Sequence, residues 1–372
     1  MDRESENWKN APRNNGHQLH SICSYMAMFP PSIPNHFIKK YSEHGDVVLD
    51  PFSGRGTTPL EACLLGRVGV GNDRNPLAFV LTKAKTDTPA KDKIISKIKK
   101  LETEFYSGNR PSPHAESKIK MLYNTKTLQQ LLFLREKLDW KKSNVDTFIT
   151  AMVLGIMHGR SAGYLSIPMP NTFSMSPNYV KKYKKNHKLR RQYRDVFALL
   201  LRKLERCYQK PVVQGYAFMG DVRSLGDIPD ESVKLIVTSP PYTRVIRYGA
   251  FNWIRLWFLD ESAKQIDKQL LCTQSLSLYH SFIIESLKEM KRVIKKDGKI
   301  VMVIGDVRDK HTGEVLNLAQ SVWESCASTM GLKLVVPIIE DSIEDSSKVS
   351  RIWGKTKGMA TKIDRILVLQ YA

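Results

Sequence analysis

Residues 238–242 read Thr-Ser-Pro-Pro-Tyr and directly follow a short apolar run, Leu235–Val237. Two adjacent prolines remove two backbone N–H donors and fix φ twice, so a sheet ladder cannot continue through them. They hold the Ser239 side chain, the Pro240 carbonyl and the Tyr242 ring in one rigid arrangement. A stiff turn is sufficient to explain a Pro-Pro pair by itself, so the other reactive residues of the chain decide its meaning.

Three acidic residues follow three other apolar runs. Asp50 opens DPFSGRGTT, Asp73 lies 23 positions further on in GNDRNP, and Asp221 lies in FMGDVRSL. The ends of parallel strands meet at one sheet edge, so these acids should surround the crevice where such folds bind ligands. An acid after the second strand typically holds ribose hydroxyls. Asp73 could instead cap a helix that begins near Asn75-Pro76.

The glycines of DPFSGRGTT indicate a ligand-binding turn. Gly54 and Gly56 permit a tight turn and close approach of a ligand, and the helix that follows offers unpaired N–H groups. The dinucleotide pattern G-x-G-x-x-G and the phosphate-loop pattern GK[ST] do not occur. Asp50 would repel a pyrophosphate and suits a cationic ligand. S-adenosylmethionine, which carries an ammonium and a sulfonium charge, fits this turn.

In these residues the sequence resembles the amino-methyltransferases of DNA, which methylate exocyclic nitrogens of cytosine or adenine. The resemblance rests on DPFSGRGTT and TSPPY in one chain and in this order, with weaker matches in HSICSYMAMFPP, GNDRNP, GDVRSL and NWIRLWF. It implies S-adenosylmethionine as the cofactor and double-stranded DNA as the partner. It also implies a restriction-modification or related system, in which a cognate restriction endonuclease could be a second partner.

The resemblance assigns roles by position. Asp50 and the glycine turn would hold the methionine part of the cofactor, Asp73 the ribose hydroxyls and Asp221 the adenine amino group, while Phe29 would flank the cofactor. The implied cofactor-binding residues are Phe29, Asp50, Pro51, Phe52, Gly54, Gly56, Thr57, Asp73 and Asp221. The implied catalytic residues are Ser239, Pro240, Pro241 and Tyr242.

The Ser-Pro-Pro-Tyr element suits chemistry on an exocyclic amine. Such an amine is a poor nucleophile because its lone pair is delocalised into the ring. The Ser239 oxygen and the Pro240 carbonyl could accept its two hydrogens and turn the lone pair toward the methyl group, which is a positioning effect. Tyr242 would stack on a base swung out of the duplex.

The first residue of this element favours one base over the other. In the family, Ser before Pro-Pro-Tyr is most often associated with N4 of cytosine, whereas Asp or Asn is commoner in enzymes that act on N6 of adenine. Carbon-5 methylation needs a cysteine that typically follows a proline, and none of the five cysteines does. N6-adenine methylation, RNA base methylation and a non-catalytic nucleic-acid-binding subunit are the alternatives.

Short apolar runs must position these residues. Seven are predicted as strands: Val47–Leu49, Val68–Gly71, Tyr216–Met219, Leu235–Val237, Ile300–Ile304, Leu334–Ile339 and Ile366–Gln370. Helical patterns lie between several of them, including Thr58–Leu65 and Tyr279–Ile294, the latter followed by a predicted turn at KKDGK. This alternation predicts an α/β fold, a Rossmann-like doubly wound methyltransferase sheet of about seven strands. A polar loop joins the last two strands, so one of them could be antiparallel.

Helical patterns alone fill the stretch between Thr86 and Pro211. The predicted helices are Lys91–Tyr106, Thr125–Leu138, Thr147–His158 and Asp195–Cys207. We therefore expect three segments. Residues 1–85 contain an N-terminal arm and the cofactor half of the methyltransferase domain, 86–211 form a helical insertion that is the candidate DNA-contact and target-recognition region, and 212–372 form the catalytic half.

The charge balance points to a polyanionic partner. The chain has 58 Lys+Arg against 37 Asp+Glu, a formal net charge of +21. The densest run, KKYKKNHKLRRQYR at 181–194, has no acid and is predicted to follow a phosphate backbone, with a solvated helix face as the alternative. The predicted nucleic-acid-binding residues are Lys181, Lys182, Lys184, Lys185, Arg190, Arg191, Arg244 and Arg247. Arg244 and Arg247 could instead pair with acids.

The cysteines and the hydropathy exclude other classes. Five scattered cysteines without a CxxC pair argue against a disulfide framework or a zinc site and suit a reducing compartment. The first thirty residues are polar, and no apolar run reaches the roughly 20 residues that cross a bilayer. We expect a cytoplasmic protein without a metal. No motif indicates its oligomeric state or recognition sequence.

Overall fold

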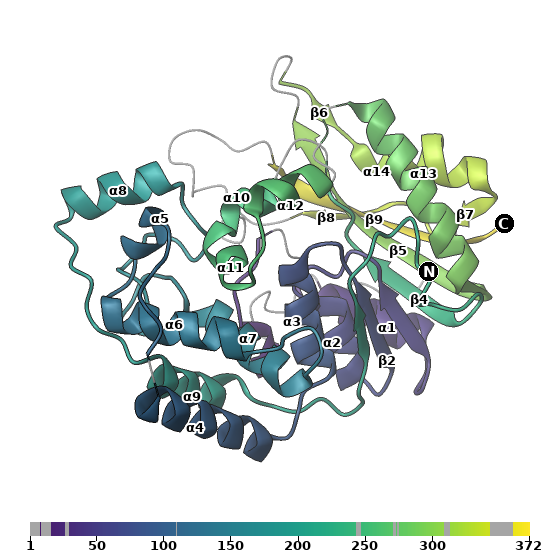
Figure 1. Cartoon of the computed structure of the whole chain (residues 1–372). Helices are drawn as coiled ribbons and strands as arrows, with labels where there is room; N and C mark the ends of the chain where they lie inside the picture. Colours follow the sequence, from purple (N-terminus) through teal and green to yellow (C-terminus); the bar gives the residue numbers. More distant parts are fainter. Residues whose placement is uncertain are drawn as a thin grey trace.

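A mixed sheet flanked by helices forms the centre of the computed structural model (Figure 1). The structure describes residue 8 and residues 16–26, 30–108, 110–242, 247–270, 273, 275–308, 313–342 and 360–372. Within these residues the sheet has nine strands in the order β3-β2-β1-β4-β5-β9-β7, with β6 paired to β5 and β8 to β9. The strands are β1 Val47–Asp50, β2 Val68–Asn72, β3 Tyr216–Phe218, β4 Val233–Thr238, β5 Ile294–Arg308, β6 Val315–Leu316, β7 Leu332–Leu334, β8 Ile339–Ser342 and β9 Ala360–Tyr371.

The strand order creates a crevice between β1 and β4. Strands β3, β2, β1, β4 and β5 are parallel, and the chain reverses its direction of travel across the sheet after β3. Ligands bind at such a switch point, outside the carboxyl ends of the strands. Leu49 of β1 pairs with Ile236 of β4, so Asp50 and Thr238 end neighbouring strands.

The central strands are apolar on both faces because helices cover both. On β5, Val301 and Val303 pack in the cluster that contains α1 (Ser32–Tyr41), whereas Ile300, Met302 and Ile304 pack in the cluster of α13 (Leu276–Val293). Successive side chains of a strand point to opposite faces, so a continuous apolar run is what a doubly covered sheet requires.

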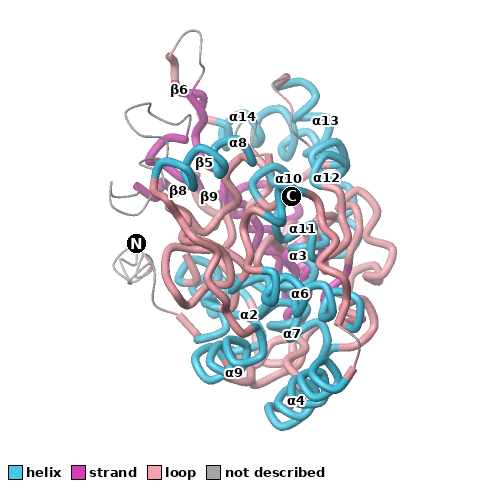
Figure 2. The backbone as a smooth tube through the Cα atoms, turned by 60° about the vertical axis from the view of Figure 1, so that its left-hand side comes forward, coloured by secondary structure: helices cyan, strands magenta, loops and turns pink. Residues whose placement is uncertain are grey.

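Helices fill the chain between β2 and β3. After α2 (Thr57–Leu64), which precedes β2, come α3 Pro76–Thr86, α4 Lys91–Ser107, α5 Ser117–Lys120, α6 Thr125–Lys137, α7 Asn144–Ile156, α8 Pro177–Asn186 and α9 Val196–Cys207. The remaining α-helices of the described residues are α10 Tyr248–Phe251, α11 Trp253–Phe258, α12 Ala263–Gln269 and α14 Leu318–Val322. Figures 1 and 2 place α4 and α9 at one end of this helical layer and α8 at the other.

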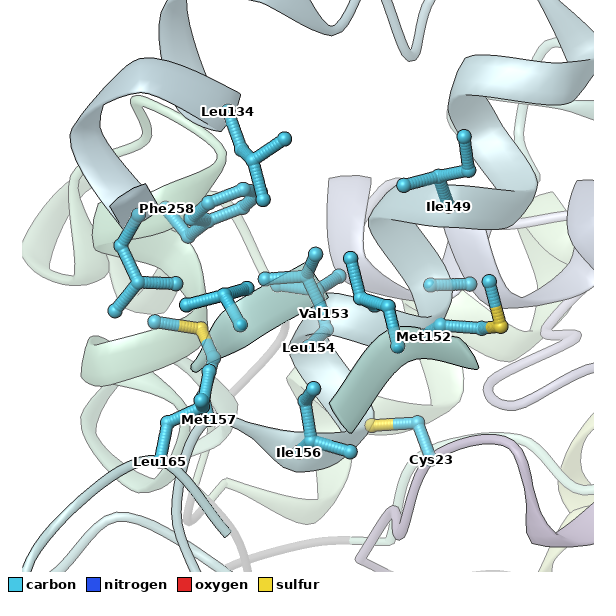
Figure 3. Close-up of a cluster of buried hydrophobic side chains, with 14 of the residues drawn as sticks. Cys23, Leu134, Ile149, Met152, Val153, Leu154, Ile156, Met157, Leu165 and Phe258 are labelled. Atoms are coloured by element: carbon cyan, nitrogen blue, oxygen red, sulfur yellow. The ribbon is translucent and has the colours of Figure 1, made fainter. Parts of the chain in front are cut away.

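The inserted helices share their core with the helices of the sheet. Helix α7 is buried on nearly every side, and Figure 3 shows Met152, Val153 and Leu154 among side chains from other elements. Leu134 of α6 and Phe258 of α11 belong to the same cluster. This cluster also includes the buried side of α3, which packs along α7. The helical layer is therefore continuous with the α/β part.

The predicted elements agree with the structure except at the C-terminal strands. The four inserted helices and the first four strands are confirmed within three residues at each end, and β9 is antiparallel to β5 as one alternative expected. The predicted turn at KKDGK is wrong, because Ile294 to Arg308 form one strand whose pairing with β4 has a register shift. The predicted strand Leu334–Ile339 is split into β7 and β8 around Pro337, which cannot donate to a ladder.

Among the described residues, no helix has the length and apolar character that a bilayer crossing demands.

Candidate active site

Asp50 and the Ser-Pro-Pro-Tyr element meet directly at the crevice. The Thr238 hydroxyl donates to Asp50 Oδ1 at 2.6 Å, and the Phe52 N–H donates to the same oxygen at 3.1 Å. Asp50 is only 1% exposed, and burial raises the pKa of its carboxyl to about 7. A buried carboxyl held in this way fixes the ends of β1 and β4 relative to each other.

The glycine turn is tied to the end of β2. Gly54 has a φ of +52° and donates its N–H to Asp73 Oδ2 at 2.9 Å, while the Asn75 N–H donates to Asp73 Oδ1 at 2.9 Å. Gly56 has a φ of +74°, which favours glycine. The alternative of Asp73 as a helix cap is wrong, since Asn75 caps α3 by accepting from the Leu77 N–H.

A buried lysine binds the backbone of the glycine turn. Lys85 of α3 is fully buried, and its Nζ donates to the Arg55 carbonyl between the two glycines. Burial lowers the pKa of the Lys85 amine well below its usual range, helped by nearby Arg55. The Arg55 side chain turns inward and donates to Thr57 Oγ1 at 3.1 Å. The turn is therefore anchored through its backbone and through Arg55.

Asp221 is held between two arginines at the third strand end. Arg223 donates to both of its oxygens, at 3.0 and 2.8 Å, and Arg74 donates to Oδ2 at 2.6 Å. Hydrogen bonds from Arg223 hold the pKa of this carboxyl below its usual range. Asp221 therefore remains anionic at neutral pH. Its side chain is still 24% exposed.

Ser239 is fixed by Tyr242. The Ser239 hydroxyl and the Tyr242 hydroxyl share a hydrogen bond of 3.1 Å. Burial raises the pKa of Tyr242 far above its ordinary value, so this hydroxyl stays neutral. Its ring packs against Gly305 of β5, where a Cβ would come within 2.9 Å of the ring. The Tyr242 ring is thus packed against the sheet.

One cavity of about 400 Å³ joins the two halves of the site. Predicted residues that line it are Pro51, Phe52, Gly54, Asp73, Asp221, Ser239 and Pro241. Asp50, Gly56, Thr57, Pro240 and Tyr242 are not among its lining residues. Phe29 lies outside the described residues, as does Arg244. The cofactor turn and Ser239 therefore face a common space.

Sequence reasoning missed an aromatic wall of this cavity. The rings of Tyr25 and Tyr248 stack at 6.0 Å between centroids, with 28° between their planes, and Asn75 Nδ2 donates to Tyr25 Oη at 3.1 Å. Tyr25 lies in the weaker match HSICSYMAMFPP, and Tyr248 follows the Ser-Pro-Pro-Tyr element closely enough to suggest a contact near an extruded base, but no spacing predicts that the two rings meet. Arg74 and Arg223 lie beside predicted acids, and that adjacency could have indicated them.

Helices α10 and α12 form one side of the cavity mouth. The Asp267 carboxylate of α12 accepts hydrogen bonds from the N–H groups of Gly249 and Ala250 at 2.7 and 3.1 Å. Arg247 Nε forms an ion pair with Asp267 Oδ2 at 3.5 Å. The pairing of Arg247 with an acid follows the alternative given for it. Lys268 and Gln269 of α12 line the cavity.

The weaker family match NWIRLWF has a structural role. Arg255 of α11 is only 2% exposed and donates to the carbonyls of Leu154 and Thr172 and to the side chains of Asn252 and Ser24. These bonds join α11 to α7 and to the segment that carries Tyr25. A buried guanidinium without hydrogen bonds would be costly, so its acceptors fix this arrangement.

The basic segment is divided between an exposed helix and a loop. Lys181, Lys182 and Lys185 on α8 are exposed and have no carboxylate partner within the described residues. Lys184 is half-buried, and burial lowers the pKa of its amine. Arg190 is exposed in the loop, and Arg191 donates to the Lys120 carbonyl at 2.8 Å.

The sheet order and a switch-point cavity with strand-end acids define a Rossmann-like methyltransferase fold. A family model described as DNA methylase, of the N6 and N4 methyltransferase type, matches residues 2–83 and 233–365, more than half of the chain. The chain belongs to this DNA methylase family. The unmatched stretch contains α4 to α9.

Three curated relatives are type II methyltransferases. M.MvaI of Kocuria varians is 23% identical over 68% of this chain and 61% of its own length. M.MjaI and M.MjaII of Methanocaldococcus jannaschii are 32% and 31% identical over 25% and 18% of this chain, and over 33% and 13% of their own lengths. The chain thus spans less than two thirds of each relative.

Solved structures with some similarity include two from Thermus thermophilus. A DNA modification methylase complexed with S-adenosyl-L-methionine is 22% identical, with a TM-score of 0.26 over 41% of this chain and 51% of the other. TrmN is 10% identical, with a TM-score of 0.38 over 95% of this chain and 52% of the other.

S-adenosylmethionine is the methyl donor of the DNA methylase family, and the residues of the cavity fit it. The volume is that of a small-molecule site. Asp73 keeps free lone pairs beside two glycines that let a ligand approach the backbone. Phe52 and Val222 supply apolar walls, and Asp221 supplies a permanent acceptor.

Proposed function

We propose that this protein transfers a methyl group from S-adenosylmethionine to the exocyclic N4 of cytosine in double-stranded DNA. The observation that carries the proposal is the cavity that Gly54 and Asp73 share with Ser239 and Pro241. Family membership supports DNA as the substrate. The preference for cytosine rests on Ser239 in the position where Asp or Asn is commoner among adenine enzymes.

In this proposal the cofactor half of the cavity binds and orients. Asp73 accepts hydrogen bonds from the ribose hydroxyls, and the backbone at Gly54 contacts the methionine part. Asp221, which lines the cavity and is partly exposed, accepts from the adenine amino group. Asp50, Gly56 and Thr57 act through the turn and the end of β1, since they lie behind the cavity lining.

The catalytic half positions the amine. Ser239 Oγ and the Pro240 carbonyl accept its two hydrogens, which points the nitrogen lone pair toward the methyl group. Pro240 does not line the cavity, so the amine must reach past the lining at Ser239 and Pro241 to contact its carbonyl. The bound cofactor would supply an electrophilic methyl group: the nitrogen would form the new N–C bond, the electron pair of the broken C–S bond would stay on sulfur, and one of the two amine protons would leave to solvent. Tyr242 holds Ser239 through their 3.1 Å hydrogen bond. Stacking of Tyr242 on the base would require its ring to leave Gly305.

The target base must leave the duplex to reach Ser239, because the amine of a paired base is engaged with its partner. The cavity volume and the aromatic wall of Tyr25 and Tyr248 support a site for one extruded base beside the cofactor. The type II methyltransferases among the relatives support a role in a restriction-modification system. A cognate endonuclease is the expected partner there.

The experiment is methylation of DNA with isotopically labelled cofactor, digestion to nucleosides and identification of the labelled nucleoside by mass. Labelled N4-methylcytosine is the expected product. N6-methyladenine would overturn the choice of base, and label only in RNA would overturn the choice of polymer. Absence of label from every substrate, with intact nucleic-acid binding, would point to a non-catalytic subunit.

A further inference from the structure

Helix α8 lies beside the mouth of the active site. The Ser174 N–H, just before α8, donates to the Phe251 carbonyl of α10 at 2.7 Å. Ser176 and Pro177 share a second cavity of about 290 Å³ with Ala250 and Phe251. Tyr248 at the start of α10 lines the first cavity. A duplex with one base extruded into that cavity would pass over α10 and meet α8.

One side of α8 packs on the helical layer, and three aromatic rings contact one another along the helix. Val180 is fully buried and fixes α8 to the helical layer. The rings of Tyr179 and Tyr183 stack, with 5.8 Å between centroids and 16° between planes. The centroids of the Tyr183 and His187 rings are 4.0 Å apart, with 31° between the planes. Spacing of four residues puts these three rings in one row along the helix. These ring contacts restrain the three side chains relative to one another.

The outward side of α8 is polar and cationic. Asn178, Lys181, Lys182 and Lys185 follow the i, i+3, i+4, i+7 spacing that places residues on one face. All four are exposed, and no carboxylate pairs with the three lysines in the described part of the chain. Charges gathered on one face without counterions favour a polyanion.

The dimensions of α8 fit the major groove of B-DNA better than duplex RNA or a single strand. It has ten residues, so it is about 15 Å long and spans roughly four base pairs, and its diameter of about 10–12 Å matches the major groove of B-DNA. The major groove of duplex RNA is too narrow for side chains to read. Single strands bind to open ring faces, whereas Tyr183 has neighbouring rings on both sides.

We propose that α8 is a reading helix that enters the major groove of DNA next to the extruded base. Asn178 is suited to the edge of adenine, and Lys181, Lys182 and Lys185 are suited to guanine or to phosphates. The stacked row fixes the register of these side chains. This inference rests on the proposed function, because it takes the duplex across the mouth of the methyl-transfer site. It adds the element that selects the flanking sequence.

The first experiment measures binding and does not depend on methyl transfer. A triple variant, Lys181→Gln with Lys182→Gln and Lys185→Gln, is compared with Lys99→Ala plus Lys100→Ala on α4, at the far end of the helical layer. Three probes are used: a long DNA duplex of random sequence, duplex RNA of the same sequence, and a single strand of that sequence. Unchanged melting temperature and cofactor affinity verify that both variants are folded.

The triple variant should bind duplex DNA more weakly, and its slope of log K against log salt should fall by about 2–3, close to one for each lost phosphate contact. The α4 variant should behave as wild type. Equal affinity and slope in both variants would overturn the proposal. A wild type that prefers duplex RNA or the single strand would overturn it as well.

The second experiment tests base reading. Modified positions are sequenced in DNA from cells that express wild type or Asn178→Ala. The variant should methylate the same nucleoside but lose discrimination at one flanking position, by about 10-fold or more for one bidentate contact. An identical motif with equal selectivity would remove Asn178 from reading. Failure of the cytosine assignment would appear separately, as a different nucleoside in the wild type.

Discussion

Ser239 is the residue on which the chemistry depends most. It lines the cavity, and its hydroxyl is held by a partly buried, neutral Tyr242. An acceptor held in this way needs no rearrangement when the amine arrives, so its contribution belongs to the chemical step and not to cofactor binding.

Ser239→Ala should therefore lower kcat by about 100-fold or more, the loss expected for a key positioning contact, and leave cofactor affinity nearly unchanged. Tyr242→Phe removes only the partner of Ser239 and should cost less. Single-turnover rates and calorimetric titration with the cofactor measure the two quantities. A Ser239→Ala enzyme with normal turnover would exclude Ser239 from the mechanism.

Asp50 makes a pH-dependent contribution to stability. Burial raises the pKa of its carboxyl from an ordinary 3.8 to about 7, so the folded protein keeps a proton that the unfolded chain releases near pH 4. The stabilisation from this proton is complete below about pH 4 and is lost as pH rises through 7, because ionisation of the buried group is unfavourable.

Asp50→Asn keeps an acceptor for Thr238 and Phe52 but does not titrate. Between pH 4 and 7 the unfolding free energy of wild type should fall relative to that of the variant by at most about 4 kcal/mol. Chemical denaturation at several pH values measures the difference. Exposed Asp227→Asn is the control and should run parallel to wild type. Parallel curves for Asp50→Asn would contradict the assignment.

At the scale of elements, the turn between β1 and α2 is held from several sides. The Gly54 N–H donates to Asp73, the Lys85 amine donates to the Arg55 carbonyl, and the Gly56 backbone lies against α3. A Cβ at Gly56 would lie 2.8 Å from Thr82 Cα, in addition to the strain of a positive φ. Gly45 has a φ of +85° with nothing within 4 Å of such a Cβ, so it is a matched control.

Gly45→Ala should cost about 1–2 kcal/mol of stability, the strain of a left-handed residue alone. Gly56→Ala should cost at least about 2 kcal/mol more and should also weaken cofactor binding, because either α3 or the turn must move. Thermal or urea unfolding and cofactor titration measure both effects. Equal costs at the two positions would show that the packing against α3 does not constrain the turn.

Sequence patterns predicted the site best where a motif directly follows a predicted strand. The meeting of Asp50 with the Ser-Pro-Pro-Tyr element follows from adjacent strand ends, and the 2.6 Å bond from Thr238 confirms the adjacency. The clamp on Asp221 could not be predicted in the same way. Its Arg74 comes from the end of β2, 147 positions away, and only the pairing of β2 with β3 joins them.

The turn signal after α13 coincides with an irregularity in the strand ladder. Ile294 pairs with Val233 and Lys299 pairs with Leu235, so Lys-Lys-Asp-Gly (295–298) lies inside β5 at a register shift. Glycine and aspartate are weak in strands, and the pairing of β5 with β9 begins only at Ile300. Pro337 lies in the interval between β7, which ends at Leu334, and β8, which begins at Ile339, where its missing N–H removes no ladder bond.

At the scale of the whole molecule, the inserted helical layer carries exposed positive charge near the active site. The net charge of +21 draws the chain to a polyanion at long range, and the exposed lysines of α8 place part of it beside the mouth of the site. Long-range attraction does not select a sequence, so selectivity must come from the few side chains that reach base edges.

The shared core of α7 with α3 and α11 constrains how such an enzyme can change its target. A recognition module that folds alone can be exchanged between relatives as a block. Here the inserted helices bury their apolar sides against α3, which carries the Lys85 that binds the cofactor turn, and against α11, which carries Arg255. Transplanting them would leave both donor and recipient with mismatched interiors. New specificities should therefore arise by substitutions on the exposed side of α8, with the interior left intact.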